Sequence, residues 1–128
     1  MLWFWFFMLI SNLMVPCIMI GFGKHFSKEA PQKINLTFGY RTGMSMKNKD
    51  TWEFAHKYIG KLWFRLGLII LVLSIAPMLI VFGKDVETVG NLSIIIWVVQ
   101  LVPLVGSIIP TEVALKKAFD KNGKRKIL

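Results

Sequence analysis

Charged residues are missing from three long stretches of the chain. Residues 2–23, 66–83 and 88–111 contain none, although charged residues make up 18% of the 128 residues and hydrophobic residues 55%. A soluble domain of this size would need a mostly polar surface, so this composition excludes an ordinary soluble protein. Apolar stretches that are separated from the charged ones are instead typical of an integral membrane protein.

Cysteine and histidine are also scarce. A single cysteine, Cys17, excludes an internal disulfide and a multi-cysteine zinc site. His25 and His56 have no second ligand at metal-binding spacing, so we expect both to be solvated surface side chains. No pattern resembles a nucleophile with its base, a pair of catalytic carboxylates or a phosphate-binding glycine loop. We therefore expect no enzymatic activity, no metal and no cofactor.

The apolar stretches predict three transmembrane helices, at about residues 2–22, 62–82 and 92–109. Each has close to the roughly 20 helical residues that cross a hydrocarbon core. The first stretch has no basic segment before it and no small-residue cleavage site after it, which argues against a cleaved signal peptide. The predicted fold class is an all-α membrane protein, with a single three-span domain over residues 1–128.

Basic residues are distributed unequally among the segments that flank these helices. The predicted loop 24–61 and the tail 112–128 are rich in Lys and Arg, whereas the second connection contains only Lys84, beside two acidic residues. The positive-inside rule places the loop and the tail in the cytoplasm and the N-terminus outside. We attribute the net charge of +9 to flanks that face anionic lipid rather than to a nucleic-acid surface.

A short amphipathic helix is predicted at the cytoplasmic face, before the second span. Asp50 and Glu53 have the spacing of a capping box, in which each side chain bonds the backbone of the other residue. Trp52, Ala55, Ile59 and Leu62 then fall on one helical stripe. We expect this helix to lie in the membrane interface.

The tail repeats this pattern. Thr111 could cap a second interfacial helix, and the pair Asn122-Gly123 could end it. The apolar face of this predicted helix contains Leu115, Ala118 and Phe119.

Small or polar residues recur along the predicted spans and define a polar seam. Ser93, Gln100 and Ser107 are seven residues apart, and Asn12 is a polar residue of the first span. A second set with the same spacing consists of Gly60, Gly67 and Ser74. Such residues allow close helix packing in lipid. The polar seam could instead line a path or a ligand cavity, so both interpretations stay open.

Several segments carry a family pattern: Gly39-Tyr40-Arg41-Thr42, then Ser45-Met46-Lys47-Asn48, then Trp52, Ala55 and Gly60. The tail adds Thr111-Glu112, Leu115-Lys116-Lys117, Phe119-Asp120 and Gly123-Lys124-Arg125. From about residue 36 to 126 the chain resembles the SdpI family of bacterial membrane proteins, and is similar to the C-terminal membrane domain of its larger members. Gly43 departs from the pattern, which has proline after the threonine.

The resemblance implies a protein of the bacterial plasma membrane related to immunity proteins, which protect a producer cell from its own secreted toxic peptide. The best-known member also holds a transcriptional autorepressor at the membrane when the toxin is present. The implied partners are therefore a toxic peptide outside and a soluble regulator inside, in addition to membrane lipids. A second copy of the chain is a further candidate partner, and direct nucleic-acid binding is not expected.

A ligand or partner site is predicted at the family segments, with the candidate residues Gly39, Tyr40, Arg41, Thr42, Trp52, Arg65 and Glu112. A guanidinium, a hydroxyl and an adaptable backbone suit the binding of a phosphate or a carboxylate. Alternatively, these charges form a structural cluster. Because an unpaired charge near a span end is costly, we expect an ion pair of Glu112 with Arg65 or Arg41.

Two functions from different classes follow. The leading hypothesis is a non-enzymatic immunity or binding protein that protects against or senses a membrane-active toxic peptide. The alternative is a small oligomeric transporter or channel subunit, whose path would be lined by the polar seam.

Overall fold

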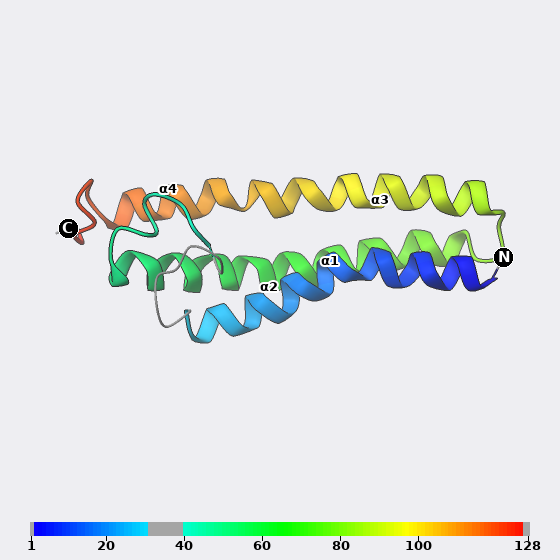
Figure 1. Cartoon of the computed structure of the whole chain (residues 1–128), viewed down its shortest axis with the longest axis horizontal. Helices are drawn as coiled ribbons and strands as arrows, with labels where there is room; N and C mark the ends of the chain where they lie inside the picture. Colours follow the sequence, from blue (N-terminus) through cyan, green and yellow to red (C-terminus); the bar gives the residue numbers. More distant parts are fainter. Residues whose placement is uncertain (1, 31–39, 127–128) are drawn as a thin grey trace.

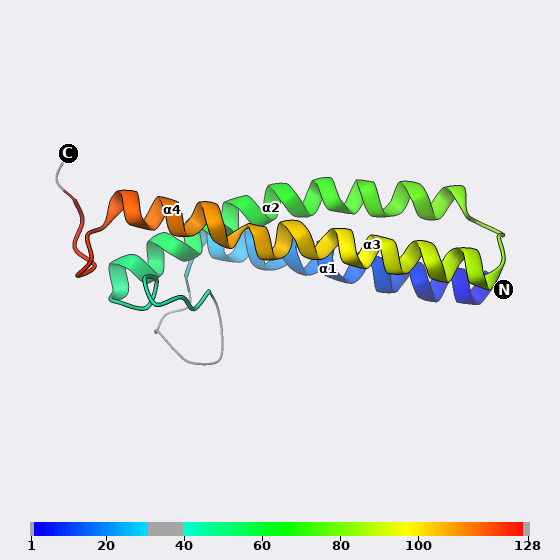
Figure 2. The ribbon, with the colours of Figure 1, turned by 90° about the horizontal axis from the view of Figure 1, so that it is seen from above.

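Three long helical rods lie side by side in an elongated bundle (Figure 1). The structure is a computed structural model that describes residues 2–30 and 40–126. The helices of these residues are α1 (Leu2–Lys28), α2 (Lys49–Ile80), α3 (Val86–Gly106) and α4 (Ile108–Ala118). α4 continues the direction of α3, so that the two form the third rod (Figure 2). All three rods are long and apolar enough to cross a membrane, which confirms the predicted all-α, three-helix architecture.

The two ends of the bundle differ. The N-terminus and the turn between α2 and α3 lie at one end, here called the turn end (Figures 1 and 2). The segment that precedes α2 and the C-terminal tail lie together at the other end, here called the loop end. The loop and the tail therefore share one side of the bundle, as the charge distribution predicts. Which end is cytoplasmic stays a prediction.

α2 begins at Lys49, well before the predicted start of the second span at residue 62. No proline interrupts it before Pro77, so the helix continues through the segment that was predicted to be a separate interfacial helix. The described residues contain no separate interfacial helix. The predicted apolar stripe is nevertheless confirmed, because Trp52, Ala55 and Ile59 are buried and Leu62 is partly buried.

The N-terminus of α2 is capped by a different residue from the predicted one. Asn48 is the N-cap, and Thr51 completes a capping box with it. Asp50 and Glu53 lie inside the helix and do not form the box, so the predicted cap is wrong. Both pairs have the same spacing of three residues, which is why spacing alone could not choose between them.

A break at Ser107 separates α3 from α4. Pro110 has no N–H to donate to the carbonyl of Gly106, so the helical hydrogen-bond ladder is interrupted there. Thr111 lies inside α4, and its hydroxyl donates to the Ser107 carbonyl at 2.8 Å instead of capping a helix. The predicted cap at Thr111 is therefore wrong: the tail helix begins before it, at Ile108, and continues the third rod.

α4 packs on the first turns of α2 at the loop end. Leu115 and Phe119 are buried there against Ala55, with Ala118 partly buried beside them. The predicted apolar face of the tail is thus confirmed. The helix ends at Ala118, before its predicted stop, and Gly123 belongs to the turn that follows, where its φ is +83°.

α1 and α2 approach closely at glycines. A Cβ on Gly60 would lie 2.5 Å from the Ser27 nitrogen, and one on Gly23 would lie 2.6 Å from the Phe64 nitrogen. A Cβ on Gly67 would meet an isoleucine side chain of α1 at 2.7 Å. Such close backbone contact is how small residues associate helices in lipid. The predicted packing role of Gly60 and Gly67 is confirmed.

Candidate functional site

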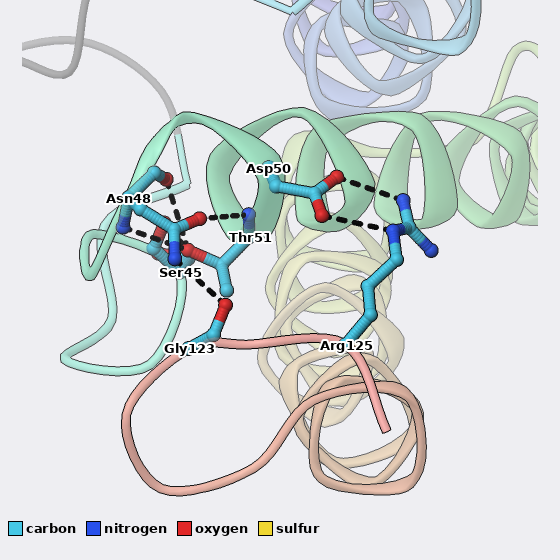
Figure 3. Close-up of polar contacts among 6 residues, drawn as sticks. All are labelled: Ser45, Asn48, Asp50, Thr51, Gly123 and Arg125. Carbon is cyan, nitrogen blue, oxygen red and sulfur yellow. Dashed lines mark hydrogen bonds and ion pairs between the residues drawn. The ribbon is translucent and has the colours of Figure 1, made fainter. Parts of the chain in front are cut away.

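A network of short hydrogen bonds orders the loop before α2 (Figure 3). Asn48 Oδ1 accepts from the Thr51 N–H at 2.9 Å, and Thr51 Oγ1 accepts from the Asn48 N–H at 3.1 Å. The Thr51 hydroxyl donates to the Ser45 carbonyl at 3.0 Å. Ser45 Oγ accepts from the Thr42 N–H at 2.9 Å and donates to the Tyr40 carbonyl at 3.1 Å. The loop is therefore tied both to itself and to the first turn of α2.

The C-terminal tail is fastened to this loop (Figure 3). Asn48 Nδ2 donates to the Gly123 carbonyl at 2.7 Å. Nε and Nη2 of Arg125 each donate to one carboxylate oxygen of Asp50 at 2.8 Å. The guanidinium carbon also lies 5.0 Å from the centre of the Phe119 ring. These contacts, here called the tail clasp, fix the guanidinium in a bidentate geometry.

The backbone conformation of the turn at Gly123 is compatible with the contact between the tail and Asn48. At Gly123 the positive φ disfavours a side chain, and a Cβ would lie 2.6 Å from Asn48 Nδ2. The Asp120 carboxylate accepts from the N–H groups of Lys124 and Asn122 at 3.0 and 2.9 Å. These bonds lower the pKa of Asp120 below its usual value, and the bond from the Lys124 N–H has the largest effect. The carboxylate therefore stays ionised and holds the turn.

His56 is fully buried beneath the loop, so the prediction of a solvated side chain is wrong for it, whereas His25 is exposed as expected. Its Nε2 accepts from the Tyr40 N–H at 2.8 Å, and its Nδ1 lies 2.8 Å from the Trp52 carbonyl. A backbone N–H can only donate and a carbonyl can only accept. The ring is therefore the neutral tautomer with its proton on Nδ1, and it joins the loop to α2.

Tyr40, Arg41 and Thr42 line a pocket of about 430 Å³ at the loop end. Its other walls are mainly apolar side chains from all three rods: Ile18, Phe22, Phe26, Ile59, Trp63, Leu104 and Ile108. A guanidinium and a hydroxyl beside an apolar wall suit an amphiphile with an anionic head group. Of the other predicted binding residues, Gly39 lies outside the described residues, and Trp52 is buried away from this pocket.

The Tyr40 hydroxyl lies between this pocket and Glu112. Burial, and then the nearby negative charge of Glu112, raise the pKa of Tyr40 far above its usual value. The hydroxyl therefore keeps its proton and remains a donor, with the Ile108 carbonyl 3.5 Å away. Oε2 of Glu112 is buried and has no hydrogen-bond partner within the described part of the chain.

The expected ion pair of Glu112 with Arg65 or Arg41 is not found. Within residues 2–30 and 40–126, the ion pairs of 4.0 Å or less are Arg125–Asp50 and Lys49–Glu53. Arg65 is exposed beside Lys24 and Lys61, where α1 meets α2. A long basic side chain near the loop end of α2 can extend to the lipid head groups, so it does not require the ion pair that the prediction assumed.

The polar seam, Asn12, Ser93, Gln100 and Ser107, lies buried in the bundle. Asn12 Nδ2 donates to Ser93 Oγ at 3.2 Å, and Gln100 Nε2 donates to the Asn12 carbonyl at 2.7 Å and to Ser74 Oγ at 2.8 Å. Ser107 Oγ accepts from the Trp63 indole N–H at 2.8 Å. The seam thus connects all three rods by hydrogen bonds, which is a packing role. Asn12 Oδ1 and Gln100 Oε1 have no partner among the described residues.

Sequence reasoning missed the contacts of three residues at the loop end: Asn48, His56 and Arg125. Asn48 had a usable signal, because a threonine follows it at capping-box spacing. His56 follows Trp52 by four residues and therefore lies on the same, buried face of α2. The contact of Arg125 with Asp50 joins residues 75 positions apart and has no local signal.

Comparison with known proteins gives one match. The model of the SdpI/YfhL protein family matches residues 32–111, which include the loop, α2 and α3. No curated protein and no solved structure matches the chain. The described residues also contain no group of three or more His, Cys, Asp or Glu side chains that could hold a metal ion.

Proposed function

Because the chain belongs to the SdpI/YfhL protein family and has three helices that could cross a membrane, we propose that it is a non-enzymatic immunity protein. It binds or senses a membrane-active toxic peptide and thereby protects the cell that makes it. The family match carries this proposal, since the matched segment contains Tyr40, Arg41 and Thr42 and most of the polar seam. No catalytic family is indicated.

The proposed location is the bacterial plasma membrane, with the N-terminus outside and the C-terminus in the cytoplasm. The basic loop and tail lie together at the loop end, which suits an anionic cytoplasmic leaflet. A peptide would meet the turn end and the helix surfaces within the membrane. A soluble regulator would meet the tail clasp at the other end of α2.

The alternative, an oligomeric transporter or channel subunit, has less support. Asn12, Ser93 and Gln100 bond to one another across the helices of one protomer. These bonds favour packing over a water-filled path, whose lining groups would be solvated.

Deletion of the gene should sensitise the species that encodes this chain to its own spent growth medium. The measurement is survival of the deletion strain, the parent and a complemented strain after exposure to that medium. Medium boiled and treated with a protease is the control, since a peptide toxin would be destroyed. Equal survival of the deletion strain and the parent in untreated medium would contradict immunity.

A cytoplasmic reporter enzyme fused after Leu128 should be active, whereas a periplasmic reporter fused there should be inactive. The reason is the excess of Lys and Arg at the loop end, which resists transfer across the membrane. The orientation is measured with paired fusions. A cytoplasmic and a periplasmic reporter are each fused at Leu128 and, separately, at the outer turn after Lys84. We expect opposite results at the two sites, and activity of the periplasmic reporter at Leu128 would reverse the orientation.

A further inference from the structure

Three basic side chains lie together where α1 crosses α2 at the loop end. Lys24 and Ser27 of α1 and Lys61, Phe64 and Arg65 of α2 line a pocket of about 320 Å³, here called the crossing pocket. No acidic side chain belongs to this lining. Within residues 2–30 and 40–126, the ion pairs of 4.0 Å or less do not involve any of the three cations. The crossing pocket is therefore electropositive, without a carboxylate of the described chain to balance it.

The close contact of the two helices keeps these cations near one another. Lys24 and Lys61 directly follow the glycines at which the backbones touch, and a Cβ on Gly23 would lie 2.7 Å from the Gly60 carbonyl oxygen. Arg65 comes one helical turn after Lys61, on the same side of α2. Like charges on such fixed backbone positions repel one another, and a bound anion would offset this repulsion.

The crossing pocket lies at the depth where both helices change from apolar to charged. The charge-free stretch 2–23 ends directly before Lys24, and the charge-free stretch 66–83 begins directly after Arg65. α1 and α2 run in opposite directions, so both boundaries lie toward the loop end (Figures 1 and 2). In a membrane, such a boundary lies at the level of the lipid head groups.

An apolar surface continues from the crossing pocket toward the turn end. Leu68 and Val72 follow Arg65 at three and seven residues, so they extend the row of Lys61 and Arg65 along α2. They are 45% and 64% exposed. Phe64 adds an apolar wall to the pocket itself. A soluble anion gains nothing from such a surface, whereas the acyl chains of a phospholipid can pack along it.

We propose that the crossing pocket binds the phosphodiester of an anionic phospholipid from the leaflet at the loop end. Lys24 and Lys61 neutralise the phosphate from the two helices, and the planar guanidinium of Arg65 suits two parallel hydrogen bonds to its oxygens. Basic pockets between transmembrane helices bind anionic head groups in this way. A zwitterionic lipid fits less well, because its ammonium group would lie among three cations. This inference goes beyond the proposed function, since it requires a membrane but no toxic peptide.

Native mass spectrometry of the whole chain in a neutral detergent counts the lipids that stay bound. The probes are phosphatidylglycerol and phosphatidylethanolamine with the same acyl chains. We expect one phosphatidylglycerol to bind about tenfold more tightly than phosphatidylethanolamine. Glycerophosphoglycerol, the same head group without acyl chains, should not displace the lipid at equal concentration. Equal binding of the two lipids would overturn the inference, and displacement by the head group alone would overturn a lipid as the ligand.

Two pairs of exposed lysines separate a defined site from a general attraction to the basic end. Lys24 and Lys61 line the crossing pocket, whereas Lys28 and Lys57, each four residues away on the same helix, do not. Lys24→Gln and Lys61→Gln should each weaken phosphatidylglycerol binding about fivefold, the effect of one cation near a phosphate. Lys28→Gln and Lys57→Gln remove the same charge and should weaken binding less than about twofold. Equal weakening by all four variants would show a diffuse attraction and overturn the site.

The unfolding temperature gives a second measurement, which does not depend on lipid retention in the mass spectrometer. A ligand that binds the folded state raises this temperature. Added phosphatidylglycerol should raise it for the parent and for Lys28→Gln, and by less than about half as much for a Lys24→Gln/Arg65→Gln double variant. Both substituted side chains are exposed, so the variant should fold without lipid. An equal rise for the parent and the double variant would overturn the inference.

Discussion

Gly60→Ala is expected to lower the free energy of unfolding in detergent micelles by about 2 kcal/mol, although alanine is the better helix former. The added Cβ would lie 2.5 Å from the Ser27 nitrogen and 2.8 Å from both the Gly23 carbonyl oxygen and the Phe26 carbonyl carbon. All three are backbone atoms, so no side-chain rotation can relieve the contact. α1 must move away from α2, and the dispersion contacts along the crossing are lost.

Gly21→Ala is the matched control for this substitution. Gly21 also lies within a helix, but a Cβ there would have no atom within 4 Å. The control should therefore be neutral or stabilising by up to about 1 kcal/mol, the helix-propensity difference between the two residues. The midpoint of denaturant-induced unfolding measures both variants. Equal effects of Gly60→Ala and Gly21→Ala would show that α1 and α2 do not meet at Gly60.

The three helices could be predicted because each depends on composition within its own segment. Their ends could not, since a helix does not stop where the hydrocarbon core stops. α2 begins at Lys49 because its helical backbone hydrogen bonds extend to that residue, and because the stripe that begins at Trp52 is buried against neighbouring elements. Apolar stretches thus locate the segments that could cross a membrane, whereas packing beyond those segments determines how far each helix extends.

At the loop end, sequence patterns near residue 50 were not sufficient to predict the helix cap. Asn48 with Thr51 and Asp50 with Glu53 both satisfy capping-box spacing. In the structure Asp50 is engaged by Arg125, and Asn48 bonds the carbonyl of Gly123. The choice of cap therefore agrees with contacts from the far end of the chain, which no pattern near residue 50 contains.

The predicted binding residues divide in the same way. Tyr40, Arg41 and Thr42 are adjacent in sequence and do line one pocket. The link from Glu112 to this group runs through Tyr40 rather than through an arginine. The prediction considered only charged side chains as partners of Glu112. In the structure the half-buried phenol of Tyr40 lies beside this carboxylate instead. Ligand binding in this pocket stays a prediction.

His56→Ala is expected to lower the free energy of unfolding by about 3 kcal/mol. His56 appeared isolated in the sequence because its partners are backbone groups, the Tyr40 N–H and the Trp52 carbonyl, which every residue type offers. The substitution leaves a cavity beside Phe26 and Trp52, whose rings lie 5.0 and 4.2 Å from the imidazole. It also leaves the Tyr40 N–H without its acceptor, so the start of the loop should detach and trypsin should cleave after Arg41 faster.

Two further variants separate the lost hydrogen bond from the lost volume. The Oε1 of glutamine can take the place of Nε2, so His56→Gln should restore slow cleavage of the loop, whereas His56→Asn, which reaches only the position of Nδ1, should not. His25→Ala is the surface control and should change the unfolding free energy by no more than about 0.5 kcal/mol. Because the bond to Tyr40 joins the start of the loop to α2, equally rapid cleavage of the Gln and Asn variants would mean that packing of the ring, and not its acceptor, holds this part of the loop in place.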